Sequence, residues 1–135
     1  MESFFQHEYI FTAGIYSTVV IALIVYLAIF EFVTKYSTWE EIKKGNVAVA
    51  LATGGKIFGV ANIFRHSIMD NNSVIGMLGW GTYGFLLLLF VYFIFEFLTP
   101  GFKVDEELKN NNLAVGLISF VLSISLSFII GASIL

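Results

Sequence analysis

The sequence predicts an all-α membrane protein whose four transmembrane helices are built from two parallel two-helix repeats. Its 135 residues are 58% hydrophobic and 13% charged, whereas soluble domains average about 45–50% apolar and about 25% charged residues. Four stretches also reach the roughly 20 apolar residues that a transmembrane helix needs. The third observation is that the two halves of the chain repeat each other's sequence.

The internal repeat is clearest where the apolar segments end and begin. Residues 29–34 share five of six residues with 94–99, and residues 40–51 share seven of twelve with 106–117. We therefore expect a single membrane domain over residues 1–135. Repeat one covers 9–69 and repeat two covers 74–135. Since each repeat holds two spans, both copies insert the same way up, related by a pseudo-two-fold axis along the membrane normal.

The spans are predicted at about residues 10–34, 46–69, 74–98 and 112–135. The first is expected to be a retained helix. Glu2, His7 and Glu8 precede it, whereas a signal peptide begins with a basic region.

Loops 35–45 and 99–111 connect the two spans of each repeat and carry helix-start signals. Thr38 can cap a short helix, with Glu41 at the capping-box position. We expect a short amphipathic helix before Gly45 and its copy around residues 105–109; the alternative is a solvated connector.

The lysines predict the orientation. The two loops contain five lysines, whereas the opposite side has Arg65 at the end of the second span and no Lys or Arg in the N-terminal tail. The positive-inside rule therefore places both loops in the cytoplasm and both termini outside the plasma membrane.

The second helix of each repeat has a face of small residues. Such residues let membrane helices approach closely, and hydroxyl groups add hydrogen bonds between helices. The simpler interpretation is helix packing, and the alternative is that one such face lines a pore or an oligomer interface. The residues concerned are Gly55, Gly59, Gly116, Ser119, Ser123, Ser127 and Gly131.

Charges within the predicted spans are the sharpest functional signal. Lys56 lies ten residues beyond Asn46, about 15 Å into a hydrocarbon core about 30 Å thick. A central lysine costs roughly 2.5–3.5 kcal/mol on insertion scales, so it needs a partner, water or a route to the interface. Because side chains lean toward the N-terminus of their helix, Lys56, Glu31 and Glu96 point toward a common level. We expect Glu31 or Glu96 to pair with Lys56. The alternative leaves both glutamates at headgroup level and Lys56 snorkelling alone.

The remaining polar residues predict structure more than chemistry. Asn46, after Gly45, and Asn112 are expected to cap the helices that follow, with hydrogen bonding at the inner mouth as the alternative. The two histidines, His7 and His66, form no zinc set or catalytic dyad with other residues, and the chain has no cysteine. We therefore expect no enzymatic activity, no cofactor or metal, and no nucleic-acid partner.

The segment from Glu41 to Ala50, followed by Gly54, Gly55 and Gly59, has its copy from Glu107 to Gly116. This pattern resembles the tandem-repeat bacterial inner-membrane proteins of the YjfL and YshE type, with Asn111 where the pattern has glycine. The resemblance covers nearly the whole chain. It implies a small four-span protein of the bacterial plasma membrane, in a family of uncharacterised function. It also implies a membrane partner for a peripheral envelope-stress protein.

Two functions fit these observations. We expect a non-enzymatic scaffold or anchor that self-associates in the lipid bilayer and presents its loops to a peripheral cytoplasmic stress protein. The alternative is an oligomeric ion or small-solute channel that uses Lys56 with Glu31 and Glu96.

Overall fold

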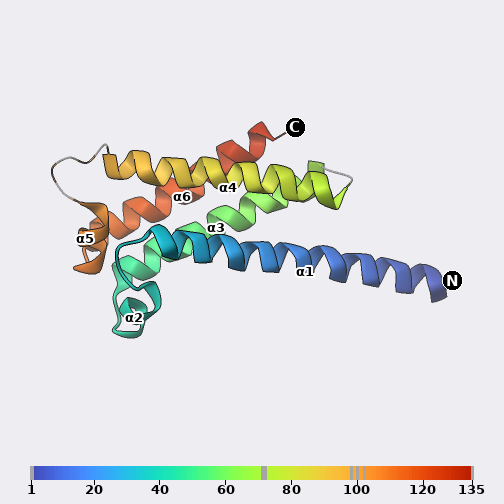
Figure 1. The fold of residues 1–135 in the computed structure, drawn as a ribbon, viewed down its shortest axis with the longest axis horizontal. Helices are drawn as coiled ribbons and strands as arrows, with labels where there is room; N and C mark the ends of the chain where they lie inside the picture. Colours follow the sequence, from blue (N-terminus) through green and yellow to red (C-terminus); the bar gives the residue numbers. More distant parts are fainter. Residues whose placement is uncertain (1, 71–72, 98, 100, 102, 135) are drawn as a thin grey trace.

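The computed structural model describes residues 2–70, 73–97, 99, 101 and 103–134, and within these ranges the regular structure is helical (Figure 1). Four long helices are joined by two short helices at one end of the molecule. The helices are α1 Glu2–Val33, α2 Thr38–Lys43, α3 Val47–Asp70, α4 Val74–Phe97, α5 Val104–Lys109 and α6 Leu113–Ser133.

Four helices are long and apolar enough to cross a membrane, which confirms the predicted fold class. Their apolar segments are His7–Val33, Val47–Asp70, Val74–Glu96 and Leu113–Ser133. The order of elements is consistent with two parallel repeats, since each half has a long, a short and a long helix. The predicted span ends at residues 98 and 135 lie outside the described residues.

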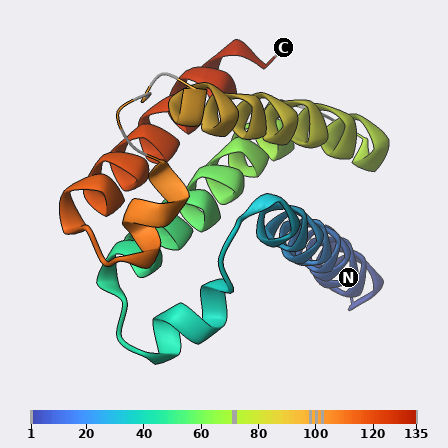
Figure 2. The same ribbon diagram turned by 60° about the vertical axis from the view of Figure 1, so that its left-hand side comes forward.

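We call the end of the bundle that holds α2 and α5 the loop end, and the opposite end, with both termini, the terminal end (Figure 1). Helix α3 is the centre of the bundle and packs against α6, α4 and α1. Helix α1 diverges from the other helices toward its N-terminus (Figures 1 and 2). Only 11% of the apolar stretch of α1 is buried, against 61% in α3, so most of the surface of α1 is not covered by the rest of the bundle.

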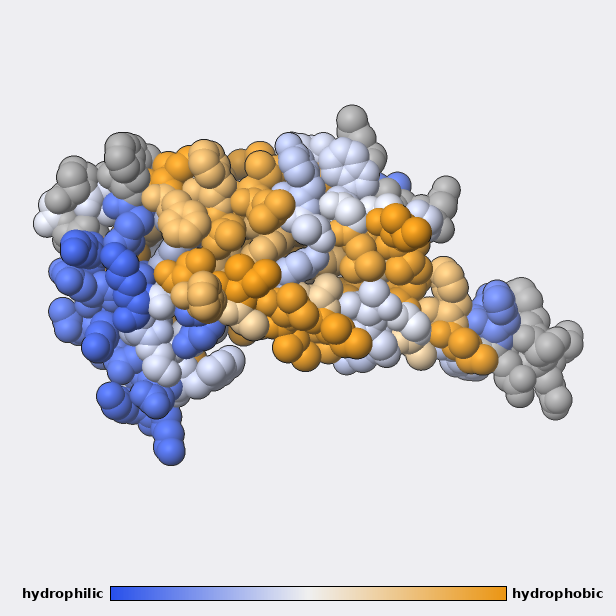
Figure 3. Space-filling view, viewed as in Figure 1, coloured by the Kyte–Doolittle hydropathy of each residue, from blue (hydrophilic) through white to orange (hydrophobic). Residues whose placement is uncertain are grey.

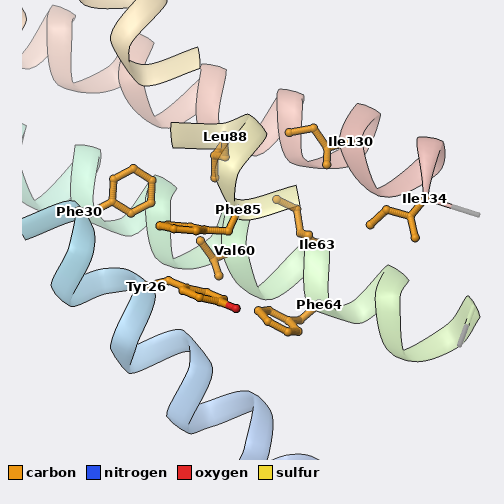
Figure 4. Close-up of a cluster of buried hydrophobic side chains, with 9 residues drawn as sticks. All are labelled: Tyr26, Phe30, Val60, Ile63, Phe64, Phe85, Leu88, Ile130 and Ile134. Atoms are coloured by element: carbon orange, nitrogen blue, oxygen red, sulfur yellow. The ribbon is translucent and has the colours of Figure 1, made fainter. Parts of the chain in front are cut away.

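An apolar core fills the bundle on the terminal-end side of Phe30 (Figure 4). The rings of Tyr26 and Phe85 stack with centroids 4.4 Å apart, and the Tyr26 hydroxyl forms a hydrogen bond with Thr82. Glycines bring α4 close to α3, because a Cβ on Gly84 would lie 2.5 Å from Ile63. The nine core residues are Tyr26, Phe30, Val60, Ile63, Phe64, Phe85, Leu88, Ile130 and Ile134.

A second cluster, the loop-end cluster, fixes the short helices to the long ones. Val104 and Leu108 of α5 are each 1% exposed against α3, so this loop is a packed part of the fold. The cluster consists of Tyr36, Ala48, Val49, Ala52, Val104, Leu108 and Val115.

Candidate functional site

The first loop ends in a tight helix cap. Gly45 adopts φ +87° after α2, a left-handed conformation that glycine adopts at little cost. The Gly45 N–H donates to the Ile42 carbonyl, at 2.9 Å, and the Asn46 N–H donates to the Glu41 carbonyl, at 3.0 Å. These two bonds form the Schellman arrangement, which satisfies the free carbonyls at a helix end.

The second loop has the same cap with a different residue. Asn111 adopts φ 59° after α5, and its N–H donates to the Leu108 carbonyl, at 3.0 Å. The Asn112 N–H donates to the Glu107 carbonyl, at 2.9 Å. Asparagine visits the left-handed region more readily than most residues, so Asn111 keeps the turn that Gly45 makes in the first copy.

The Asn46 side chain links the two repeats. Its Oδ1 accepts from the Val49 N–H at 3.0 Å, which is the expected helix cap. Its amide nitrogen lies 3.2 Å from Glu41 Oε1, 2.9 Å from the Leu108 carbonyl and 3.0 Å from the Lys109 carbonyl. Asn46 therefore ties the start of α3 to the end of α5, and it serves both of the roles that the sequence left open.

The equivalent Asn112 makes the local bonds alone. Its Oδ1 accepts from the Val115 N–H at 3.4 Å, and its amide donates to Glu107 at 2.9 Å. The two caps thus share the bond to the glutamate five residues earlier, while the bonds between repeats belong to Asn46.

The prediction that Thr38 caps α2 is wrong. The residue before the helix is Ser37, whose side chain forms no capping hydrogen bond, and Thr38 is the first helical residue. Glu41 turns away from a capping box and instead accepts from Asn46 and from Lys44, at 3.4 Å. These bonds, the one from Asn46 first, lower the pKa of Glu41 below its ordinary value.

Lys56 is 7% exposed, and its ammonium group lies over two aromatic rings. Nζ is 5.1 Å from the Phe30 ring centroid and 4.8 Å from that of Tyr92. Desolvated cation–π contacts are worth up to about 2 kcal/mol each, similar in total to the roughly 2.5–3.5 kcal/mol that a central lysine costs. Among the described residues, none accepts a hydrogen bond from this ammonium.

The predicted ion pair of Lys56 with Glu31 or Glu96 does not form. In the part of the chain that the structure describes, the one ion pair joins Lys44 and Glu41. Glu31 is held by the loop, because its Oε1 accepts from the Thr38 N–H at 3.0 Å. The carboxylates whose charges act on Lys56 are those of Asp105 and Glu31.

Glu96 belongs to the other loop. The backbone N–H groups of Val104 and Asp105 donate to its carboxylate, while its buried Oε2 has no hydrogen-bond partner in the described residues. The two repeated glutamates thus do the same work. Each leaves the end of a long helix and holds the backbone at the start of the short helix that follows.

Asp105 is the site residue that sequence reasoning missed. It is 4% exposed, accepts from the Lys35 N–H at 3.1 Å and accepts from the Tyr92 hydroxyl. Asp105 therefore connects repeat one to the aromatic ring that covers Lys56. A carboxylate in the first turn of a short polar helix is ordinarily exposed, so its residue type and position did not single it out. The sequence does contain one sign of its special role. The equivalent position in repeat one is Trp39, so the two repeats differ here.

Carboxylates also surround Tyr36 at the loop end. Burial is the main reason that the pKa of Tyr36 is raised, and Asp105, Glu31 and Glu41 raise it further. Its hydroxyl is buried without a hydrogen-bond partner in the described residues. Tyr36 therefore stays neutral throughout the physiological range.

Lys56 separates two cavities. The larger, of about 360 Å³, lies between α1, α2 and α3 and is lined by Glu31, Thr34 and Lys56 among others. The smaller, of about 30 Å³, lies on the other side of Lys56, where Ser119 and Ser123 of α6 contribute to its wall. Lys56 and Glu31 thus line the same cavity, whereas Glu96 lines neither of the two. Among the described residues, no three His, Cys, Asp or Glu side chains come together as metal ligands.

The small-residue faces of α3 and α6 meet within one chain. A Cβ on Gly55 would lie 2.8 Å from the Phe120 backbone, and one on Gly116 would lie 2.7 Å from the Ala48 backbone.

The contact continues toward the terminal end of both helices. A Cβ on Gly59 would lie 3.1 Å from the Ser123 carbonyl, and Gly131 faces His66. Between them, Asn62 donates to the buried hydroxyl of Ser127 at 3.0 Å.

Comparison with known proteins agrees with the loop motifs. Residues 4–134 match the family described as Domain of Unknown Function (DUF350). A relative from Bacillus subtilis (strain 168), described as UPF0719 transmembrane protein YshE, is 57% identical over 134 residues, 99% of this chain and 100% of that protein. No solved structure matches this chain. The resemblance to the YshE type is confirmed over nearly the full length.

Proposed function

This chain belongs to the DUF350 family of unknown function, and we propose that this integral membrane protein is a non-enzymatic scaffold. Its two short helices form a fixed surface at the loop end that binds an acidic peripheral protein. The observation that carries the proposal is the difference in exposure between the lysines and the acids at this end.

At the loop end all the lysines are exposed, whereas two of the five loop acids are buried. All five lysines of the two loops are exposed, whereas Glu41 and Asp105 are buried. The exposed acids there are Glu40 and Glu106. Figure 3 shows the resulting hydrophilic surface over α2 and α5, next to the apolar surface of the long helices. The two loops carry five lysines and five acids in the sequence, and the burial of some of the acids therefore leaves a basic face.

This basic face has a fixed shape, which favours binding of a partner. Asn46 ties α2 and α3 to α5, and the loop-end cluster buries the apolar side of α5. A preorganised surface loses less entropy on binding than a mobile loop does.

The proposed setting is the bacterial plasma membrane, with the loop end in the cytoplasm and both termini outside. The positive-inside rule supports this orientation, and the family resemblance supports an envelope-stress protein as the partner. We further propose that the chain self-associates through the exposed apolar surface of its long helices, including α1.

The test is site-specific photo-crosslinking in membranes. We expect crosslinkers at Lys43 and Lys109 to capture the same peripheral protein, and a crosslinker at exposed Arg65, at the terminal end, to capture none. Charge reversal by Lys44→Glu should abolish capture, because surface charge guides such encounters. Capture that is absent, or equal at Arg65, contradicts the scaffold.

The second candidate is the oligomeric channel, favoured by the buried Lys56 ammonium at the wall of a cavity. The aromatic core fills the bundle beyond Phe30, so a path through the membrane needs several chains. Ion flux in liposomes that is lost in Lys56→Met or Glu31→Gln supports this candidate. Wild-type liposomes without flux exclude it.

A further inference from the structure

The larger cavity has a polar and an apolar part of its wall, which we call its polar end and its apolar end. Glu31, Thr38 and Lys56 form the polar end, and Ile24, Leu27 and Ala28 of α1 form the apolar end. Its volume of about 360 Å³ is within the range of about 300–1,000 Å³ that small-molecule sites occupy. A ligand that fills it needs a polar group joined to an apolar chain.

The polar end offers both a donor and an acceptor. The Lys56 ammonium is more than nine-tenths buried and finds no acceptor among the described residues. Glu31 uses Oε1 for the Thr38 N–H, and Oε2 accepts no hydrogen bond from the residues that the structure describes. Because an unpaired charge is costly in a membrane interior, this end favours a ligand that carries both an anionic oxygen and an ammonium group.

The cavity opens toward lipid. Ile24, on its apolar wall, is 62% exposed within the apolar segment of α1, and Trp39, on its loop-end wall, is 63% exposed. Tryptophan at such a boundary is typical of the membrane–water interface. The ligand can therefore enter sideways from the bilayer, with its polar group beside Lys56 and Glu31 and its chain along α1.

We propose that the cavity between α1, α2 and α3 binds one zwitterionic phospholipid of the phosphatidylethanolamine type. Its phosphate accepts from Lys56, its ammonium donates to Glu31, and an acyl chain lies along Ile24, Leu27 and Ala28. This site is independent of the proposed scaffold, since it requires neither a peripheral partner nor the exposed lysines of the loops.

The test is native mass spectrometry of the full chain, purified in a mild detergent and supplied with phosphatidylethanolamine. We expect wild type to bind one lipid tightly and Lys56→Met to bind it about tenfold or more weakly, because a charged hydrogen bond is lost. Lys43→Met, which removes an exposed lysine, is the matched control and should bind as wild type does. Equal binding by wild type and Lys56→Met overturns the proposal.

Two further variants separate ligand binding from folding. Ala28→Trp fills the apolar end of the cavity from an exposed position, so it should weaken lipid binding while the helical circular dichroism stays unchanged. Glu31→Gln should reduce the preference for phosphatidylethanolamine over phosphatidylglycerol, which lacks the amine. Unchanged binding in Ala28→Trp contradicts the site.

The same samples distinguish a lipid from a soluble anion. Inorganic phosphate and glycerol 3-phosphate should fail to displace the lipid at concentrations equal to it. Displacement by either shows a site for a soluble phosphate and refutes the phospholipid.

Discussion

Replacing Asn46 by alanine should destabilise the protein more than the same change at Asn112. The two residues occupy equivalent positions in the two repeats, so the pair provides its own control. Both cap a long helix and both bind the glutamate five residues earlier. Asn46 alone also reaches the Leu108 and Lys109 carbonyls of the other repeat.

The expected difference follows from these bonds. Each variant loses a cap, worth about 1 kcal/mol. The two amide hydrogens of Asn46 serve three acceptors, and two bonds contribute about 2 kcal/mol or somewhat more where one acceptor is charged. Asn46→Ala should therefore cost about 3–4 kcal/mol. Asn112→Ala loses a long cap bond of 3.4 Å and one bond to Glu107, so it should cost about 1–2 kcal/mol.

The assay is reversible unfolding in mixed micelles by increasing sodium dodecyl sulfate, followed by circular dichroism. The exposed Asn110, which forms no side-chain bond in the described residues, should tolerate alanine within about 0.5 kcal/mol. Equal losses in Asn46→Ala and Asn112→Ala would falsify the inference that Asn46 joins the two repeats.

Two other predictions concern the α3–α6 contact and the acid sensitivity of the loop end. Gly116→Ala should destabilise the protein by about 1–3 kcal/mol, because the added methyl would lie 2.7 Å from the Ala48 backbone. Gly54→Ala, with nothing within 4 Å, should be neutral or slightly stabilising in the same unfolding assay; a comparable loss at both positions contradicts the packing. The second prediction follows from the lowered pKa of Glu41. Its ionised form stabilises the folded state above about pH 4.3, and that contribution is lost as pH falls through the folded-state pKa. Glu41→Gln should therefore lose less stability than wild type between pH 7 and pH 3, measured by the same unfolding transition. Parallel losses in the two proteins would show that the Asn46 bond does not act on this carboxyl.

The caps and the spans could be predicted because they depend on nearby residues. A glycine before an asparagine, at the end of a polar segment, specifies a left-handed residue followed by a helix cap. Asn111 also adopts the left-handed conformation. The two copies of the sequence motif therefore form the same helix cap. The start of α2 was the exception, because Glu41 bonds to Asn46 rather than to the start of its own helix.

The partners of the charged residues could not be predicted in the same way. Side chains lean toward the N-terminus of their helix, and this rule placed Lys56, Glu31 and Glu96 at one level. The rule does not predict which loop packs against which helix, and that packing decides the partners. In the folded protein Tyr92 of α4 and Phe30 of α1 cover the ammonium, and Asp105 of α5 supplies the nearby carboxylate. Both glutamates instead hold the backbone of the loops.

The sequence by itself determined the helical membrane fold, the four spans and the two caps, because hydrophobic length and turn chemistry act over one or two helical turns. The tertiary structure decided which charges meet, since those contacts join residues as many as 70 positions apart. It also decided that Glu41 and Asp105 are buried at the loop end while the five loop lysines are exposed. The divergence of α1 from the bundle is likewise tertiary, because an apolar helix packs equally well against lipid and against other helices.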